Sequence, residues 1–97
     1  MLTGKQRAYL RAIANRTEAL YICGKGGISE NLIKTFSDGL ESREIIKITV
    51  LETCPDTPRE VCAALCEALS ADPVQVIGRK IVLYRESRDN RKIELPK

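Results

Sequence analysis

Apolar residues recur along this chain with two periods, and each period predicts a different kind of element. Spacings of three and four residues are typical of amphipathic helices, whereas alternation in steps of two is typical of strands with one buried face. The pattern predicts helices over residues 3–15, from residue 29 onward, and over residues 57–69. It predicts strands over residues 19–23, 45–51, 74–77 and 80–85.

Cap and turn residues separate these elements. Hydroxyl residues that can accept a hydrogen bond from an unpaired helical N–H precede each helical run: Thr3, Ser29 and Thr57. Thr57 also forms a capping box with Glu60, and Pro58 occupies the first helical position. Gly78 and Arg79 form a two-residue link with glycine first, which predicts a hairpin between the last two strands.

The resulting order, α-β-α-β-α-β-β, predicts a two-layer α/β sandwich. Helices between the first three strands imply right-handed crossovers and parallel pairing, and the hairpin makes the final strand antiparallel. Polar residues within the strands, Lys47, Thr49 and Gln75, indicate that one sheet face is at least partly open. We therefore expect residues 1–86 to form a four-stranded mixed sheet with helices mainly on one face.

Charge is distributed unevenly along the sequence. Sixteen lysines and arginines stand against thirteen acids, a formal net charge of +3, and the cations gather towards the two ends of the chain. Residues 1–16 contain no acid, and residues 87–97 form a basic tail. We expect this tail to contact the domain only at the small apolar patch Ile93–Leu95. A charge asymmetry of this kind is typical of proteins that bind a polyanion.

The first predicted helix carries much of the basic charge. Helical spacing predicts that its buried stripe consists of Gln6, Tyr9, Leu10, Ile13 and Ala14. Arg7 and Arg11 lie four residues apart on one flank of the stripe, and Lys5 lies with Arg16 on the other. A basic helix face can be a solvated surface and nothing more. An acid-free helix that leads into a glycine-rich segment favours a binding role.

The four cysteines predict neither a disulfide framework nor a zinc site. The sequence has no histidine and no CxxC pair, so no zinc ligand set is complete. Cys62 and Cys66 lie one helical turn apart among apolar residues, as small core side chains do. We expect reduced cysteines and neither a metal nor a cofactor. No segment has the pattern of a membrane span or a signal peptide, so we expect a cytoplasmic protein without a membrane partner.

Residues Gly24–Gly27, with the sequence Gly-Lys-Gly-Gly, lie between a predicted strand and a predicted helix. Glycines let a ligand approach the backbone, the start of a helix presents unpaired N–H groups, and Lys25 adds a full positive charge. These features predict an anion-binding loop, and phosphate is the usual anion at such a loop. The helix cap Ser29, and Lys34 on the polar side of the same helix, complete the candidate site.

Four interpretations of this loop compete. A nucleoside-triphosphate P-loop requires GxxxxGK[ST], and the lysine here is in the wrong place. A dinucleotide fingerprint, GxGxxG, would have Ser29 in place of its third glycine, and Glu44 at the start of the next strand is poorly placed for a ribose hydroxyl. The remaining alternatives are a GxxG loop that grips a nucleic-acid backbone and a glycine-rich turn without a ligand.

The sequence gives little support for catalysis. Without histidine, the usual acid–base group at neutral pH is absent. No cysteine or serine has a recognisable activating partner, and no two acids fall at related strand ends. We therefore expect a protein that is not an enzyme and that has no small-molecule substrate.

Several segments, taken together, resemble the YhbY family, the stand-alone bacterial form of the CRM (CRS1–YhbY) RNA-binding domain. The segments are LTGKQR from residue 2, YLR from residue 9, ICGKGGI from residue 22, EIIKITVL from residue 44, GRKIVLYR from residue 78 and KIELP from residue 92. The resemblance covers nearly the whole chain. It implies a fold similar to the C-terminal domain of bacterial translation initiation factor three, with the last strand inserted beside the second.

The resemblance also implies association with precursors of the large ribosomal subunit and RNA contact through the GxxG loop and nearby basic surface. Carried over by position, it assigns RNA contact to Gly24, Lys25, Gly26, Gly27, Lys5, Arg7 and Arg11. Cys23 and Gly39 depart from the family pattern, and neither lies on the proposed contact surface. We expect a monomer that binds ribosomal RNA and assists ribosome assembly. The alternative is a protein-interaction module that docks a partner on its open sheet face.

Overall fold

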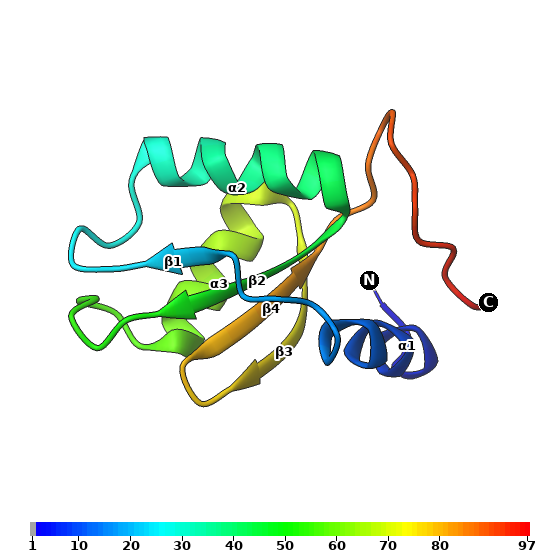
Figure 1. Ribbon diagram of the computed structural model, residues 1–97, viewed down its shortest axis with the longest axis horizontal. Helices are drawn as coiled ribbons and strands as arrows, with labels where there is room; N and C mark the ends of the chain where they lie inside the picture. The colour runs from blue at the N-terminus through cyan, green and yellow to red at the C-terminus, as the bar shows by residue number, and fades with distance from the viewer. Residues whose placement is uncertain (1) are drawn as a thin grey trace.

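The computed structural model describes residues 2–97, which form three helices and one four-stranded sheet (Figure 1). The helices are α1 (Gly4–Ala14), α2 (Glu30–Arg43) and α3 (Pro58–Leu69). The strands are β1 (Tyr21–Cys23), β2 (Ile45–Val50), β3 (Asp72–Ile77) and β4 (Lys80–Tyr84). The predicted order of elements is confirmed. Within the described range, none of the helices has the length and apolar character needed to cross a membrane.

Side chains at the three predicted caps determine where the helices begin. Thr3 and Thr57 each form a capping box, in which the threonine hydroxyl accepts a hydrogen bond from the backbone N–H of Gln6 or Glu60. The side chain of Gln6 or Glu60 accepts in return from the threonine N–H. Ser29 caps α2 with its hydroxyl alone. These bonds satisfy N–H groups that the start of a helix leaves without a partner.

The strands are arranged in the order β1-β2-β4-β3. β1 and β2 pair in parallel, and β4 is antiparallel to both β2 and β3. β4 therefore lies beside β2, as the family resemblance implied. The expectation from the helices alone, that the first three strands all pair with one another, is wrong for β2 and β3 because β4 separates them. The hairpin link is the predicted Gly78-Arg79, with Gly78 at a φ of +57°.

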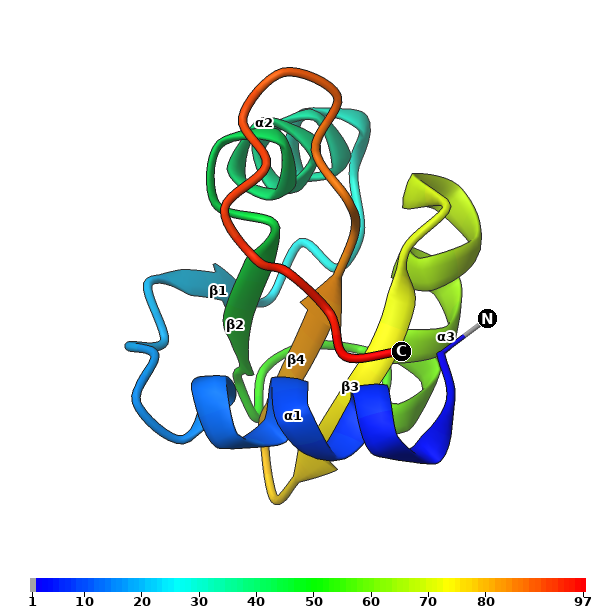
Figure 2. The same cartoon turned by 90° about the vertical axis from the view of Figure 1, so that its right-hand side faces the viewer.

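Each face of the sheet has its own hydrophobic core. Alternate residues of β2 show the division, since Ile46, Ile48 and Val50 face α2 and α3 whereas Ile45 faces α1. Two of the three helices share one face, as expected, and α1 crosses the other face (Figure 2). α1 contacts β2 and β3 but not the whole face. Ile93 and Leu95 near the C-terminus cover a further part of it. The end of the face that carries Ile22 and Ile77 is exposed.

The buried stripe of α1 is narrower than predicted. Leu10 and Ala14 are fully buried, and Gln6 and Ile13 are half-buried. Tyr9 is 43% exposed, so its assignment to the stripe is wrong. Successive helical residues project about 100° apart, and with Leu10 pointing into the core the Tyr9 side chain reaches the solvent side.

Gly39 has a packing role that the sequence does not reveal. A Cβ atom at this position would lie 2.5 Å from the Tyr21 hydroxyl oxygen and 2.9 Å from the carbon that carries it. The Tyr21 ring is held in turn by Phe36, with ring centroids 5.6 Å apart and an interplanar angle of 87°. α2 therefore needs a residue without a side chain at the point where the Tyr21 ring, from β1, packs against it.

Gly39→Ala should consequently lower the free energy of unfolding by about 1 kcal/mol. In an unobstructed helix interior the same change would raise it by about 1 kcal/mol. Urea unfolding measures the sign, and a Tyr21→Ala background should convert the change into a stabilising one. An increase in stability in both backgrounds would show that Tyr21 does not restrict this position.

The C-terminal segment, residues 86–97, leaves β4 without regular structure and returns towards α1 (Figure 2). Its backbone is held by the Glu44 carboxylate, which is fully buried. This carboxylate accepts hydrogen bonds from the N–H groups of Ser87, Lys92 and Ile93 at 2.8, 2.5 and 2.8 Å. An acidic residue at the end of α2 thus determines the path of a segment more than forty positions later in the chain.

Further contacts hold the same segment at both of its ends. Near its start, the Ser87 hydroxyl donates to a Glu41 carboxylate oxygen at 2.6 Å. Near its end, Ile93 and Leu95 pack on the core beneath α1, and the Gln6 side chain donates to the Pro96 carbonyl at 3.0 Å. The prediction that the tail contacts the domain only at Ile93–Leu95 is therefore wrong, because polar contacts also hold it along its length.

Candidate nucleic-acid interface

The loop Gly24–Gly27 forms a tight turn at one end of the molecule, where β1 stops (Figure 1). The N–H of Gly27 donates to the carbonyl of Gly24 at 2.9 Å and closes the turn. Gly27 has a φ of +65°, which glycine adopts without strain and other residues adopt rarely. The positive φ in this turn therefore requires glycine at position 27.

The connection between β2 and α3 lies beneath this loop. A Cβ atom would come within 3.2 Å of the Leu51 side chain if placed on Gly24, and within 3.2 Å of Pro55 if placed on Gly27. A Cβ atom on Gly26 would meet no protein atom within 4 Å. Packing thus accounts for the first and last glycines, whereas the bare surface at Gly26 is open to the outside.

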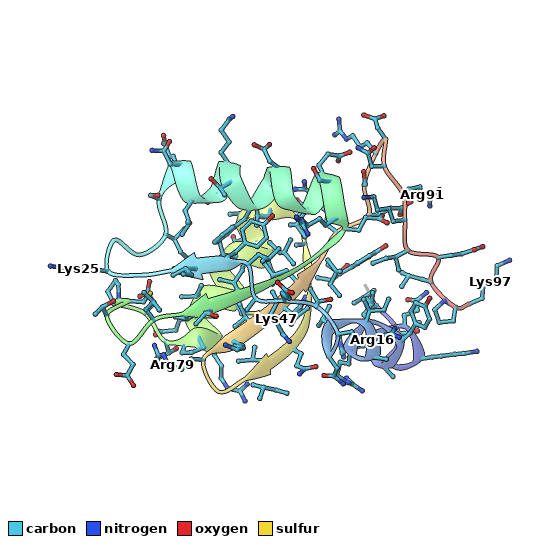
Figure 3. The ribbon with its side chains drawn as sticks, viewed as in Figure 1. Arg16, Lys25, Lys47, Arg79, Arg91 and Lys97 are labelled. Atoms are coloured by element: carbon cyan, nitrogen blue, oxygen red, sulfur yellow. The ribbon has the colours of Figure 1, made fainter. Side chains whose placement is uncertain are left out.

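Lys25 projects from this end of the molecule into solvent (Figure 3). The ion pairs within residues 2–97 are Lys34 with Asp38 and Arg91 with Glu86, so the described part of the chain offers Lys25 no carboxylate partner. Its ammonium group is available to an external anion. The loop therefore presents a free cation next to an accessible stretch of backbone.

The start of α2 adds less positive character than the sequence suggested. The Ser29 hydroxyl accepts the N–H of Leu32 at 3.2 Å, and the Glu30 carboxylate lies in the first helical turn. Lys34 is exposed but lies 3.9 Å from Asp38, which offsets part of its charge. The cationic character of the loop comes mainly from Lys25 and the glycine backbone.

The basic residues of α1 do not lie next to this loop. Lys5 and Arg11 are exposed and Arg7 is half-buried, and all three belong to α1, which lies at the other end of a molecule 38 Å long (Figure 1). α1 precedes the loop closely in sequence, but β1 carries the chain along the sheet before the loop begins. The structure therefore places Ser29 at the start of the helix that follows Gly24–Gly27, and Lys34 further along that helix. The α1 cations form a separate basic surface.

Two cysteines support the loop from below. Cys23, the last residue of β1, and Cys54 are buried with their sulfur atoms 3.8 Å apart. Burial raises the pKa of Cys23 to about 11, and the hydrogen bond with Cys54 acts in the same direction. A neutral, buried thiol is a packing group, not a nucleophile. All four cysteines are free thiols, and residues 2–97 contain no cluster of side chains that could hold a metal ion.

Lys47 and Arg79 have structural roles that the sequence does not reveal. The Lys47 ammonium donates to the carbonyl of Ala14 at 2.9 Å and caps the C-terminus of α1. The Arg79 guanidinium donates to the carbonyls of Val50 and Leu51 at 2.6 and 2.8 Å, where β2 ends. No sequence signal beyond the charge itself pointed to either role, because both depend on strand register.

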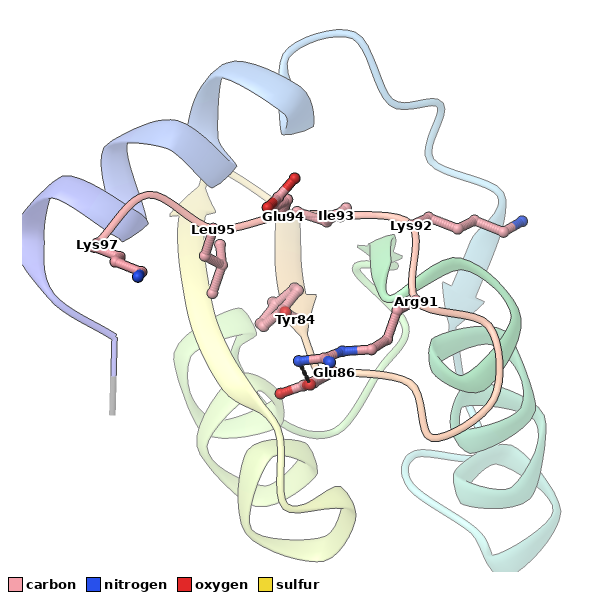
Figure 4. A pocket seen from close by; sticks show the side chains of 8 residues that line it. All are labelled: Tyr84, Glu86, Arg91, Lys92, Ile93, Glu94, Leu95 and Lys97. Carbon is pink, nitrogen blue, oxygen red and sulfur yellow. Dashed lines mark ion pairs between the residues drawn. The ribbon is translucent and has the colours of Figure 1, made fainter.

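A hollow of about 520 Å³ lies under the C-terminal segment (Figure 4). Its lining residues are Tyr84, Glu86, Arg91, Lys92, Ile93, Glu94, Leu95 and Lys97. Arg91 pairs with Glu86 there, and Lys92 points away from the hollow. Because the charges of Arg91 and Glu86 neutralise each other, the hollow is a weaker anion site than the glycine loop.

Comparison with known proteins decides the family. The family model described as the CRS1 / YhbY (CRM) domain matches residues 2–85. The chain belongs to the CRM domain family. The resemblance inferred from the sequence motifs is confirmed. All three helices and all four strands lie within the match, and the C-terminal segment lies beyond it.

This CRM domain has relatives in Bacillus subtilis and Haemophilus influenzae. The chain is 45% identical over 96 residues to the Bacillus subtilis protein named "Probable RNA-binding protein YqeI", covering 99% of this chain and 100% of the relative. It is 30% identical over 96 residues to a Haemophilus influenzae protein named "RNA-binding protein", covering 99% and 96% of the two chains.

A solved structure supports the fold. The solution structure of protein SAV1595 from Staphylococcus aureus superimposes with a TM-score of 0.82 at 51% sequence identity. The similarity covers 99% of this chain and 100% of that one. The predicted α/β class, with a four-stranded mixed sheet, is confirmed.

Proposed function

We propose that this CRM-domain protein binds RNA and grips the RNA backbone with the loop Gly24–Gly27. The proposal rests on one observation, an exposed Lys25 beside a Gly26 whose outward side meets no protein atom within 4 Å. A lysine ammonium and accessible backbone N–H groups are suited to phosphate oxygens. Membership of the CRM family, and relatives named as RNA-binding proteins, support the choice of RNA as the polyanion.

The basic face of α1 provides a second contact. Lys5, Arg7 and Arg11 lie far from the loop, so an RNA that reaches both must be extended or folded around a 38 Å protein. Most of the affinity then comes from counterion release and depends on salt. Exposed aromatic surface for base stacking is scarce, with Tyr9 at 43% exposure, so RNA shape contributes more to recognition than base edges do.

We infer that the RNA is ribosomal and that the protein assists assembly of the large ribosomal subunit. The YhbY-family resemblance carries this inference. The protein then acts in the cytoplasm as a monomeric binding protein and performs no catalysis. In sucrose gradients of cell extracts it should sediment with large-subunit precursors, and RNase treatment should release it. Sedimentation at the position of the free protein in untreated extract would contradict the inference.

Lys25→Ala should weaken RNA binding several-fold and reduce the slope of log affinity against log salt by about 0.7 to 0.9. The reason is the loss of one phosphate contact. Because Lys25 is exposed and has no carboxylate partner in the described chain, the free energy of unfolding should change by less than about 0.5 kcal/mol. Fluorescence anisotropy with a labelled ribosomal RNA fragment at several salt concentrations measures both quantities.

Arg43→Ala is the matched control. Arg43 is an exposed cation in the last turn of α2, at the opposite end of that helix from the loop. The Arg43→Ala substitution removes one positive charge from the molecule, as Lys25→Ala does. Equal salt slopes for the two variants would mean that the loop cation makes no contact of its own.

A further inference from the structure

One row of side chains crosses all four strands on the sheet face that α1 only partly covers. Strand register pairs Ile22 of β1 with Thr49 of β2, Thr49 with Lys80 of β4, and Lys80 with Ile77 of β3. Paired residues project from the same face of a sheet. The row spans three interstrand spacings, or about 14 Å at ~4.8 Å each.

The helix α1 leaves this row uncovered. The neighbouring pair, Lys47 with Val82, lies under the end of α1, where Val82 is buried and Lys47 bonds to α1. In the row itself, Ile22 is 55% exposed and Ile77 is 63% exposed. Two large aliphatic side chains therefore stand in solvent on either side of a polar centre formed by Thr49 and Lys80.

The charge on this face is positive. Lys80 is exposed, and the half-buried Arg79 precedes it in the hairpin. β1, β2 and β4 contain no acidic residue, and the acid of β3, Asp72, pairs with Tyr84 at the opposite end of that strand. A partner that suits this surface is anionic and carries apolar groups at short spacing.

We propose that unpaired RNA nucleotides lie across the row Ile22–Thr49–Lys80–Ile77. A phosphate contacts Lys80, and bases or riboses cover the two isoleucines. In a duplex the base faces are stacked on one another and cannot contact the exposed isoleucines. Single-stranded nucleotides leave those faces available for such contacts. The surface is a third contact region, distinct from both the glycine loop and the cations of α1.

This inference rests on the proposed RNA-binding function and can fail separately from it. The test titrates the ¹⁵N-labelled full chain with a 12-nucleotide oligouridine and, separately, with a 12-base-pair RNA duplex. Backbone amide shifts should appear at the four residues of the row with oligouridine, and be weaker or absent there with the duplex. Shifts limited to Gly24–Gly27 and α1 would overturn the inference and leave the proposed function intact. No binding of either RNA would contradict both.

Two variants identify the contacts. Lys80→Ala should lower oligouridine affinity about threefold to tenfold and reduce the salt slope by about 0.7. Ile77→Ser should lower the affinity to a similar extent without changing the slope. Arg43→Ala, on the opposite layer, should leave binding to the row unchanged. Unaltered affinity in both row variants would overturn the inference. Amide shifts at the row residues that appear when the protein concentration is raised without RNA would also overturn the inference. They would show that the row binds a second copy of this chain.

Discussion

Glu44→Gln should destabilise the protein by about 2–4 kcal/mol and release the C-terminal segment. One oxygen of the Glu44 carboxylate accepts the N–H groups of Lys92 and Ile93, and the other accepts the N–H of Ser87. In the glutamine variant an amide NH₂ must replace one of these oxygens and would face a donor. Because the side chain is fully buried, water cannot compensate while the segment stays in place.

Urea unfolding measures the loss of stability, and hydrogen exchange at the Lys92 and Ile93 amides reports release of the segment. Glutamine is preferred to alanine here because Glu44 has a φ of +67°, and the two long side chains carry the same backbone strain. Glu94→Gln is the control, since Glu94 is an exposed acid in the same segment. Similar stability for the two variants would mean that the buried carboxylate does not fasten the segment.

The ionisation of Glu44 also determines how the stability of the protein depends on pH. Burial alone would raise the pKa of Glu44, but hydrogen bonds from Lys92, Ser87 and Ile93 outweigh it, so its pKa is lowered. Glu41 also has a lowered pKa, first through the Ser87 hydroxyl and then through backbone N–H groups. The folded pKa lies below the unfolded value of about 4.3. The stabilisation is therefore complete above that pH and is lost as the pH falls through the folded pKa.

The wild-type protein should accordingly lose stability faster than Glu44→Gln as the medium is acidified below about pH 4.5. The difference in urea midpoint between the two proteins should shrink from neutral pH to pH 3. A difference that stays constant over this range would show that the ionised form of Glu44 is not the one that holds the segment.

Gly26→Val should reduce RNA affinity by at least about tenfold, or ~1.4 kcal/mol, and leave the fold intact. A side chain at this position meets no protein atom within 4 Å of its Cβ, so the free protein can accept it. The branched side chain would instead occupy the space in which an RNA backbone approaches the main chain. Gly26→Ala should give a smaller loss, because its single methyl group blocks less of that approach.

Gly27→Val provides the contrasting case within the same loop. Its φ of +65° and the proximity of Pro55 predict a loss of stability for this variant. Anisotropy titrations and urea unfolding on both variants separate the two effects. Undiminished affinity for a folded Gly26→Val protein would mean that RNA does not approach this loop closely.

Elements whose determinants lie close together in sequence were predicted well. The capping box of Thr57 and Glu60 and the hairpin link Gly78-Arg79 each depend on a few neighbouring residues, and both occur as predicted. The family resemblance supplied the one feature of the sheet that local patterns could not give, the position of β4 beside β2. A helix between two strands indicates that they run in the same direction. It does not indicate whether a strand from later in the chain lies between them in the sheet.

Features that depend on contacts distant in sequence were missed. The packing role of Gly39 was missed because its partner, Tyr21, lies on another element. Glu44 was considered only as a ribose ligand, and its use by Ser87 and Lys92 follows from the path of the last twelve residues. The row that includes Lys80 could not be assembled without the strand register.

The separation of α1 from the glycine loop has the same origin. Proximity in sequence suggested one continuous basic surface, but the intervening strand places the two at opposite ends of the molecule (Figure 1). The candidate residues were chosen by type and charge, which the sequence shows. Their arrangement into two surfaces is a property of the fold.

Ultraviolet cross-linking in living cells, with identification of both the attached RNA and the cross-linked peptide, tests the central claim most directly. The account predicts fragments of large-subunit ribosomal RNA attached to peptides that contain Lys25 and the surrounding glycines. Recovery of no RNA, or of RNA attached only to peptides from α3, would contradict it.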